Sequence, residues 1–235
     1  MNKIASGIII LVIVVVLGSV IYLTRPPKSA TEDIQTNTET LTPPENSKLN
    51  LTPYRISQEQ SEVEFNIDEV LNGKPFTVVG KTSQVAGDIL IDLGDLSLAE
   101  MGTIRINART LKTDNINRDG AISRLILKSE KEEFEFIEFK PISITGLPAN
   151  ANNFQRSVVE ITGELTIAGT TKTVTFGGIV DLISEDQISV LAQTKIFYKD
   201  FGLTIPEVPF VASVEDEVTL KAIINAFPVS EEGSE

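Results

Sequence analysis

Hydrophobic residues follow different patterns along this chain of 235 residues. Within 1–24 the run from Ile4 to Leu23 is almost unbroken Ile, Val and Leu, and over 25–52 apolar residues are scarce. Over 53–228 apolar and polar residues alternate, and 229–235 form a short acidic tail. Since a change of pattern indicates a change of structure, we expect these four segments to be separate structural parts.

The apolar run within the first segment predicts a transmembrane helix. It covers residues 4–23, and at about 1.5 Å per residue it would span roughly 30 Å, the thickness of the hydrocarbon core of a bilayer. A cleaved signal peptide has a shorter apolar region, of about 7–15 residues, followed by small residues at a cleavage site. Here Tyr22, Leu23 and Thr24 end the run, so we expect a retained anchor.

The charges beside this run leave its orientation nearly balanced. Lys3 and the amino terminus stand on one side, and Arg25 and Lys28 stand on the other. The very short N-terminal tail and the signal-like position favour export of the rest of the chain. We therefore expect a single-pass protein of the cell membrane whose C-terminal domain is extracytoplasmic.

The second segment, 25–52, has the composition of a disordered linker. It is rich in Thr, Pro, Asn, Glu and Ser, with proline pairs at 26–27 and 43–44. Such a segment buries too little apolar surface to offset the entropy lost on ordering. We expect a flexible tether between the anchor and the domain that follows.

The third segment, 53–228, has the period-two alternation that is typical of strands with one buried face. Val63, Phe65 and Ile67 alternate with polar residues, as do Ile104 and Ile106. Glycine-containing turns separate these runs. Many short alternating strands predict an all-β sandwich or barrel.

One stretch of the domain departs from this period. Ile122, Leu125 and Ile126 are spaced by three and four residues, after Asn117 or Asp119, either of which could cap a helix. This spacing predicts a short amphipathic helix across one end of the strands. The alternative is a connector that packs on the core.

Composition removes several classes of function. The chain has neither histidine nor cysteine, which excludes the commonest general base, the usual partner of a nucleophilic serine, and thiol chemistry. A formal charge of −13 argues against nucleic acid as a partner, because phosphates require a basic face. It argues equally against broad adhesion to anionic lipid surfaces.

A cluster of acidic residues between 130 and 138 could in principle serve catalysis or bind calcium. Its members are Glu130, Glu132, Glu133, Glu135 and Glu138. Lysines are interleaved with them, so a solvated face is the favoured interpretation. Gly-x-Ser-x-Gly, a phosphate-binding glycine loop and metal-ligand spacing are all missing from the sequence. We therefore expect no enzyme activity, and an enzyme that uses carboxylates is the least favoured alternative.

Four motifs of this chain, taken in order, resemble those of the YceI-like family. The first comprises Asn-Ile-Asn-Arg-Asp-Gly at 115–120, the acidic stretch at 127–134 and Phe-Lys-Pro at 139–141. The others are Gly-Glu-Leu-Thr-Ile-Ala-Gly-Thr-Thr-Lys-Thr-Val at 163–174, Lys-Asp-Phe-Gly-Leu at 199–203 and Val-Glu-Asp-Glu-Val-Thr-Leu at 214–220. Where family members commonly carry a histidine after the Arg-Asp pair, this chain has Ala121 or Ile122.

The resemblance implies a lipocalin-like antiparallel β-barrel of about eight strands whose interior holds a long-chain isoprenoid or a quinone-like lipid. It also implies a periplasmic or extracellular setting. A barrel of about eight strands has room for its own side chains or for one slender ligand. No cofactor beyond such a bound polyisoprenoid or quinone-like lipid is expected.

We expect the ligand-binding residues to be apolar side chains of the strands, together with polar residues at the start of the helix. The candidates are Phe65, Ile106, Asn117, Arg118, Asp119, Ile122, Leu125, Phe134, Phe136, Phe139, Phe176, Tyr198 and Phe201. Each phenylalanine could instead fill a closed core. Arg118 and Asp119 could instead form a structural salt bridge.

The favoured hypothesis is therefore a membrane-tethered lipid-binding protein that does not bind nucleic acid. Its alternative is a protein-interaction module whose barrel is filled by its own side chains. A homodimer is compatible with either. The identity of the ligand is left open by the sequence.

Overall fold

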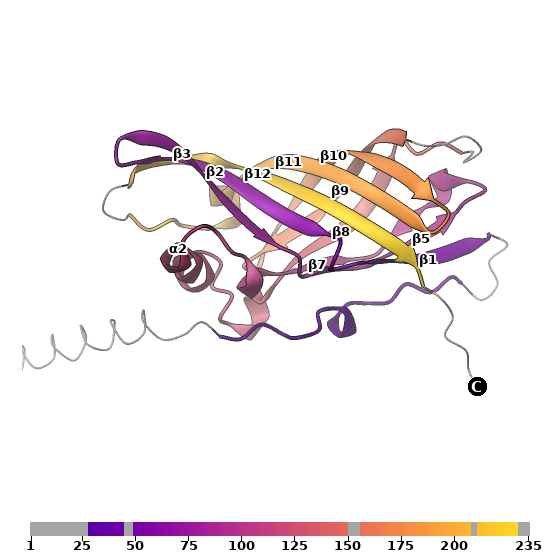
Figure 1. The fold of residues 1–235 in the computed structure, drawn as a ribbon, viewed down its shortest axis with the longest axis horizontal. Coiled ribbons are helices and arrows are strands. Elements are labelled where there is room, and N and C mark those ends of the chain that lie inside the picture. The colour runs from indigo at the N-terminus through magenta and orange to yellow at the C-terminus, as the bar shows by residue number, and fades with distance from the viewer. Residues whose placement is uncertain (1–27, 45–48, 150–155, 208–210, 230–235) are drawn as a thin grey trace, which may run out of the picture.

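The computed structural model describes residues 28–44, 49–149, 156–207 and 211–229. Within these residues twelve strands form one curled sheet, and a short helix, α2 (Ile116–Ala121), lies across one end of it (Figure 1). Every pairing between these strands is antiparallel. The strands are β1 (Leu51–Ile56), β2 (Glu62–Leu71), β3 (Lys74–Thr82), β4 (Val85–Ala86), β5 (Asp88–Asp92), β6 (Glu100–Met101), β7 (Ile104–Asn107), β8 (Phe136–Thr145), β9 (Arg156–Ile167), β10 (Thr170–Ser184), β11 (Gln187–Phe197) and β12 (Val211–Pro228).

The all-β prediction is confirmed, but the expected number of about eight strands is wrong. β4 and β6 have two residues each, which is too short for an alternating pattern to show in the sequence. They exist because neighbouring strands supply hydrogen-bonding partners. Strand number is thus a property of pairing rather than of local pattern.

Two-residue turns with positive φ join two of the hairpins. Asn72 (φ 50°) and Gly73 (φ 76°) connect β2 to β3, and Ala168 (φ 46°) and Gly169 (φ 82°) connect β9 to β10. Such turns match the twist of antiparallel strands and set their register. Register then decides which side chains face the interior, because a slip of one residue would turn each of them outward.

The two ends of the sheet come together at Gly87. The strand order is β4-β7-β8-β9-β10-β11-β12-β1-β5-β6, with β2 paired to both β12 and β3. Gly87 alone separates β4, at one end of this order, from β5, near the other end. The Ile56 N–H donates to the Gly87 carbonyl at 3.0 Å across this break. The inward faces of the strands therefore surround a common interior.

The predicted helix is present, but its predicted cap is wrong. Asn115 caps α2, its side chain accepting from the N–H groups of Asn117 and Arg118 at 2.9 and 3.3 Å. Asn117 is exposed on the helix, and Asp119 is buried. After Ala121 the helix continues as a π-helical turn, Ile122–Ile126. We call 116–126 the helical cover.

Residues 28–44 lie along the domain, and we call them the strap (Figure 1, indigo). Ile34 is fully buried and Thr38 is nearly so. This described part of the linker therefore departs from the disordered tether that its composition predicts. The reason is that the domain supplies a pocket for an isolated apolar side chain and partners for the backbone of the strap, neither of which composition reveals.

Part of the predicted organisation falls on residues outside the described ones. The predicted anchor, 1–24, and the end of the acidic tail from 230 onward belong to this part. Among the residues that are described, no helix has the length and apolar character needed to cross a bilayer.

Candidate functional site: an apolar cavity

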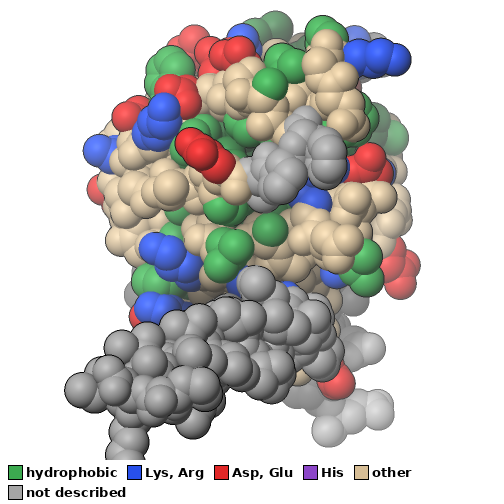
Figure 2. All heavy atoms as spheres, turned by 90° about the vertical axis from the view of Figure 1, so that its left-hand side faces the viewer, with side chains coloured by type: hydrophobic (Ala, Val, Ile, Leu, Met, Phe, Trp, Pro, Cys, Tyr) green, Lys and Arg blue, Asp and Glu red, His purple; other side chains and the backbone are tan. Residues whose placement is uncertain are grey.

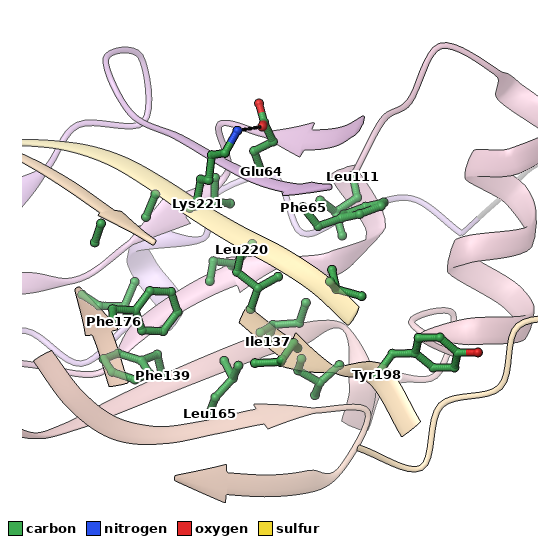
Figure 3. Close-up of a pocket in the computed structure, with 18 of the residues that line it drawn as sticks. Glu64, Phe65, Leu111, Ile137, Phe139, Leu165, Phe176, Tyr198, Leu220 and Lys221 are labelled. Carbon is green, nitrogen blue, oxygen red and sulfur yellow. Dashed lines mark hydrogen bonds and ion pairs between the residues drawn. The ribbon is translucent and has the colours of Figure 1, made fainter. Parts of the chain in front are cut away.

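A cavity of about 280 Å³ lies inside the curled sheet. Its walls are side chains from most of the strands together with Ile122, Ile126 and Leu127 of the helical cover and the turn after it. Figure 3 shows aromatic and aliphatic side chains, among them Phe65, Ile137, Phe139, Leu165 and Leu220, converging from different strands. With so few polar groups in its wall, the cavity suits an apolar occupant.

Strand alternation puts these side chains in the wall. On β9, Ile161, Leu165 and Ile167 line the cavity, whereas the residues between them face outward, except Gly163. A Cβ at Gly163 would lie 2.5 Å from the Phe139 ring and 2.6 Å from the Lys140 carbonyl. The glycine therefore leaves the space into which Phe139 turns.

Phe139 and Phe176 form an aromatic pair in the wall. Their ring centroids are 5.2 Å apart with an interplanar angle of 76°, an edge-to-face arrangement. On strands β2 and β3, the Phe65 ring lies directly over Gly80. A Cβ on Gly80 would come within 2.2 Å of that ring, so only glycine leaves room for it. Glycines thus set the positions of two cavity phenylalanines.

Six of the predicted site residues line the cavity. They are Phe65, Ile106, Ile122, Phe139, Phe176 and Tyr198. Contact of these residues with a ligand stays a prediction. Their convergence from β2, β7, β8, β10 and the two connecting segments could not be read from any one stretch of sequence.

Four further candidates lie away from the cavity wall. Phe201 is buried in the adjoining core, and Leu125 is 40% exposed on the helical cover. Phe134 lies against Gly169. Phe136 lies under the Arg105 guanidinium, 5.0 Å from its ring centroid. Phe136 lies on a strand and Leu125 in the helical cover, as predicted, but neither lines the cavity. Phe134 and Phe201 end short 3-10 helices, Glu132–Phe134 and Tyr198–Phe201, so their predicted place on strands is wrong.

The polar candidates at the helix start have partners other than each other. Arg118 pairs with Glu69 at 3.2 Å and with Asp114. The Asp119 carboxylate instead accepts from the N–H and the hydroxyl of Thr113, both at 2.7 Å. The interpretation of Arg118 and Asp119 as one salt bridge is therefore wrong.

Glu69 is a site residue that sequence reasoning missed. It borders the cavity, and its side chain is only 8% exposed where it meets Arg118. The ion pair joins β2 to α2, and Arg118 also lies 5.5 Å from the centroid of the Phe76 ring. A polar pair therefore holds the helical cover against the β2–β3 hairpin at one end of the apolar cavity.

Many aliphatic lining residues were also missed. Val218, Leu220, Ala222 and Ile224 on β12 all line the cavity. Their signal was present in part in the sequence, as alternation from Val218 to Ala222, which the outward-facing Ile223 then interrupts. The prediction favoured aromatic residues, whereas the wall is mainly isoleucine, leucine and valine.

Glu64 and Lys221 border the cavity, but their side chains point away from it (Figure 3). The Lys221 ammonium lies 3.0 Å from the Glu64 carboxylate, across β12 and β2. Partial burial alone would raise the pKa of Glu64, but hydrogen bonds from Asn66 and Lys221 and the lysine charge together lower it. The pair stabilises the outer face of the wall.

The acidic cluster of 130–138 is divided among separate basic partners. Arg124 pairs with Glu130, Arg109 with Glu132 and Glu135, and Arg105 with Glu138. No group of three or more acidic side chains placed to hold a metal ion occurs among the described residues. The cluster thus forms ion pairs rather than a paired-carboxylate site.

Together, the fold and the cavity define an all-β protein built around an apolar pocket. The YceI-like domain family matches residues 54–226, and this chain belongs to that family. Among proteins with curated descriptions, none matches the sequence.

Solved structures of similar fold include proteins from three bacteria. A polyisoprenoid binding domain from Saccharophagus degradans has a TM-score of 0.57 at 12% identity, covering 77% of this chain and 100% of that one. Burkholderia cenocepacia BcnA has a TM-score of 0.56 at 15% identity, covering 72% and 98%. The Campylobacter jejuni YCEI protein has a TM-score of 0.51 at 17% identity, covering 65% and 85%. At these identities the likeness shows a shared fold.

Proposed function

We propose that this chain is a membrane-tethered, extracytoplasmic lipid-binding protein that holds an isoprenoid-like or quinone-like ligand in its cavity. The observation that carries the proposal is the cavity itself, whose wall is almost wholly apolar. The similar domain from Saccharophagus degradans is a polyisoprenoid binding domain, which supports a branched hydrocarbon as the ligand. The apolar run of 4–23 supports the tether.

Apolar burial is sufficient to bind such a ligand. Each buried methylene contributes about 0.8 kcal/mol, so one five-carbon isoprene unit would contribute up to roughly 3–4 kcal/mol before ordering costs. Two or three enclosed units would therefore give tight binding without any charged contact. Selectivity would come from the shape of the wall, including the Phe139–Phe176 pair.

The alternative of an interaction module with a filled core is less well supported. A filled interior would leave no space of about 280 Å³. Apolar residues do lie in register across the outside of the sheet, where Val158, Ile179, Leu191 and Ile223 are neighbours on β9 to β12. They could contact a protein, but they do not account for the cavity.

The test is mass spectrometry of lipids that co-purify with the full-length chain expressed in a bacterium. Because any membrane protein carries bulk lipid, two neighbouring variants on β12 are compared. Ala222→Phe puts a ring into the cavity wall, whereas Ile223→Phe changes an outward side chain that is 46% exposed. Cooperative unfolding checks that both variants fold.

We expect a stoichiometric long-chain isoprenoid or quinone on the wild-type protein and on Ile223→Phe, and its loss from Ala222→Phe. Equal lipid content in all three proteins would contradict the carrier proposal and favour the interaction module. Protease treatment of intact cells tests location separately: digestion of the domain is expected, and its protection would contradict the extracytoplasmic placement.

A further inference from the structure

The strap is held at its amino-terminal part by a buried ion pair of the domain. Arg109 and Glu135 pair at 2.6 Å, with side chains only 4% and 3% exposed. The Thr31 N–H donates to Glu135 at 2.7 Å, and the Ser29 carbonyl accepts from Arg109 at 3.1 Å. The strap therefore supplies hydrogen bonds to charges that water cannot reach.

A second buried charge holds the other part of the strap. Asp88 is fully buried and is paired with Arg55 at 2.9 Å. The Leu41 N–H donates to the same carboxylate at 3.1 Å. Between these two anchoring points the side chain of Ile34 is fully buried. Because separate contacts hold both ends and the middle, the strap has a defined path.

That path has a direction relative to the cavity. Ser29 lies beside Arg109, which follows β7, whereas Leu41 lies beside Gly102, which precedes β7. Arg109 also donates to the Ser129 carbonyl at 2.6 Å. The Ser129 hydroxyl in turn meets that of Ser123, in the helical cover, at 3.0 Å. The chain therefore joins the domain at the end where the helical cover closes the cavity (Figure 1).

The length of chain before the strap limits how far this end can lie from a membrane. Lys28 follows Thr24, the end of the predicted anchor, by only four residues. Four fully extended residues span at most about 14 Å. A free linker of 25–52 would have let the domain turn in any direction, but a docked strap does not.

We propose that the strap is a fixed coupling that holds the helix-covered end of the cavity against the lipid bilayer. This inference rests on the proposed function, in which 1–24 anchors the chain. The bilayer is the occupant that this end faces, and apolar side chains are exposed there among charged ones (Figure 2). Ile116 and Leu125 of the helical cover are 82% and 40% exposed.

The coupling gives a route for the ligand. Ile122 and Ile126 line the cavity from beneath the same cover whose outer side carries Ile116 and Leu125. An apolar ligand that passes this cover from the bilayer avoids exposure to water, which would oppose transfer by about 0.8 kcal/mol per methylene. A chain with a net charge of −13 is not attracted to anionic lipid. A strap that ties the domain to the anchor would hold it at the membrane without such attraction.

The experiment uses the absence of cysteine from the sequence. Ile116→Cys and Ile183→Cys each introduce one thiol for a fluorescent label on the full-length chain. The two isoleucines are both exposed, at 82% and 59%. Ile183 is the last residue but one of β10, and that end of β10 lies on the side opposite α2 (Figure 1). The labelled chains are reconstituted into phosphatidylcholine vesicles that contain phosphatidylcholine with a nitroxide headgroup.

We expect strong quenching of the label at position 116 and weak quenching at position 183. Adding Ile34→Asn to each labelled chain puts a polar amide where the strap buries an apolar side chain. It should release the strap and make quenching equal at the two labels. Glu39→Asn, an exposed change on the same strap, should preserve it. Equal quenching at the two positions, or a difference that survives Ile34→Asn, would overturn the coupling.

The failure of the proposed function would look different. Release of the chain from vesicles by carbonate would refute the tether, and the coupling with it, while lipid loading of the cavity is read independently by mass spectrometry. A chain that stays in the membrane and carries lipid, but shows equal quenching at both labels, would refute the coupling alone.

Discussion

At the scale of single residues, buried charges explain how a strongly acidic domain is held together. Arg109 and Glu135 are almost fully enclosed, and Asn107 and Thr31 complete the hydrogen bonds of the carboxylate. Replacing both members of such a pair by apolar groups changes the free energy of unfolding little. Removing only one member is costly, because it leaves a buried, uncompensated charge.

We therefore predict that Arg109→Met lowers the free energy of unfolding by about 3–5 kcal/mol, because Glu135 loses its cation. Arg156→Met is the control, since Arg156 pairs with Asp181 on an exposed face and its removal should change stability little. Urea unfolding measures the free energy of unfolding of both variants, provided that its dependence on urea concentration is the same as in the wild type. Equal losses in the two variants would contradict the interpretation of the first pair as buried.

The pair of Glu64 and Lys221 predicts a pH dependence. The pKa of Glu64 is held below its ordinary value of 4.5, so the folded state favours the carboxylate more than the unfolded state does. Its contribution to stability is therefore present above pH 4.5 and is lost as the pH falls through the lowered pKa.

Lys221→Met should raise the pKa of Glu64 and reduce stability at neutral pH, and the difference from wild type should vanish in acid. Urea unfolding between pH 3 and pH 7, about the range over which carboxylates titrate, with NMR titration of the Glu64 carboxyl, measures both effects. If Lys221→Met is destabilised relative to wild type by the same amount at about pH 3 as at about pH 7, the loss comes from the packing of the lysine methylenes and not from the ion pair.

At the scale of elements, capping and docking decide what the helical cover does. α2 has only six residues, and helices this short are not stable alone in water. Its cap at Asn115 and the Arg118–Glu69 ion pair hold it over the cavity. The strap is likewise an element made by its partners, because its own sequence has little tendency to order.

The cap can be tested with two asparagines that lie two positions apart. Asn115→Ala removes the acceptor for two backbone N–H groups and should cost about 0.5–2 kcal/mol. Asn117→Ala, on the exposed face of the same helix, should leave stability unchanged or raise it slightly, since alanine favours helix. Hydrogen exchange of the cover and urea unfolding measure the effect, and the reverse order of the two variants would contradict the assigned cap.

At the scale of the whole molecule, the cavity lowers stability unless it is occupied. Apolar walls without an occupant lose the dispersion contacts that a filled interior has. A ligand that binds only the folded state adds stability by mass action, about 2.7 kcal/mol at a hundredfold excess over its dissociation constant.

We predict that delipidated wild-type protein unfolds at a lower temperature than the loaded protein, and that added polyisoprenoid restores the higher temperature. Ala222→Phe should unfold at the same temperature with and without lipid, because the ring occupies part of the cavity. Calorimetry with the two proteins in parallel measures the shift. A shift of equal size in both would place lipid binding outside the cavity.

Much of the architecture followed from local pattern. Alternation at Val63, Phe65 and Ile67 predicted strand β2, and Val63, Phe65 and Ile67 line the cavity in the structure. The spacing of Ile122 and Ile126 predicted the helical cover. Four motifs in register predicted the family, which the match over 54–226 confirms.

The rest depended on residues far apart in sequence. Glu69 and Arg118 are 49 positions apart, and Thr31 and Glu135 are 104 positions apart. No local pattern marks such pairs, so the pairing of Arg118 with Glu69 and the docking of the strap could not be predicted. The short strands β4 and β6 were missed for the same reason, since their partners define them.

The sequence by itself determined the strand-rich class, the inward face of strands such as β2, and the family, because burial imposes a periodicity that can be read from local sequence. The tertiary structure alone decided that these faces enclose a cavity and that the cover is held by Glu69. It also decided that 28–44 follow the domain instead of leaving it. These features depend on pairing between distant segments, where buried charges and apolar surfaces find partners only once the chain has folded.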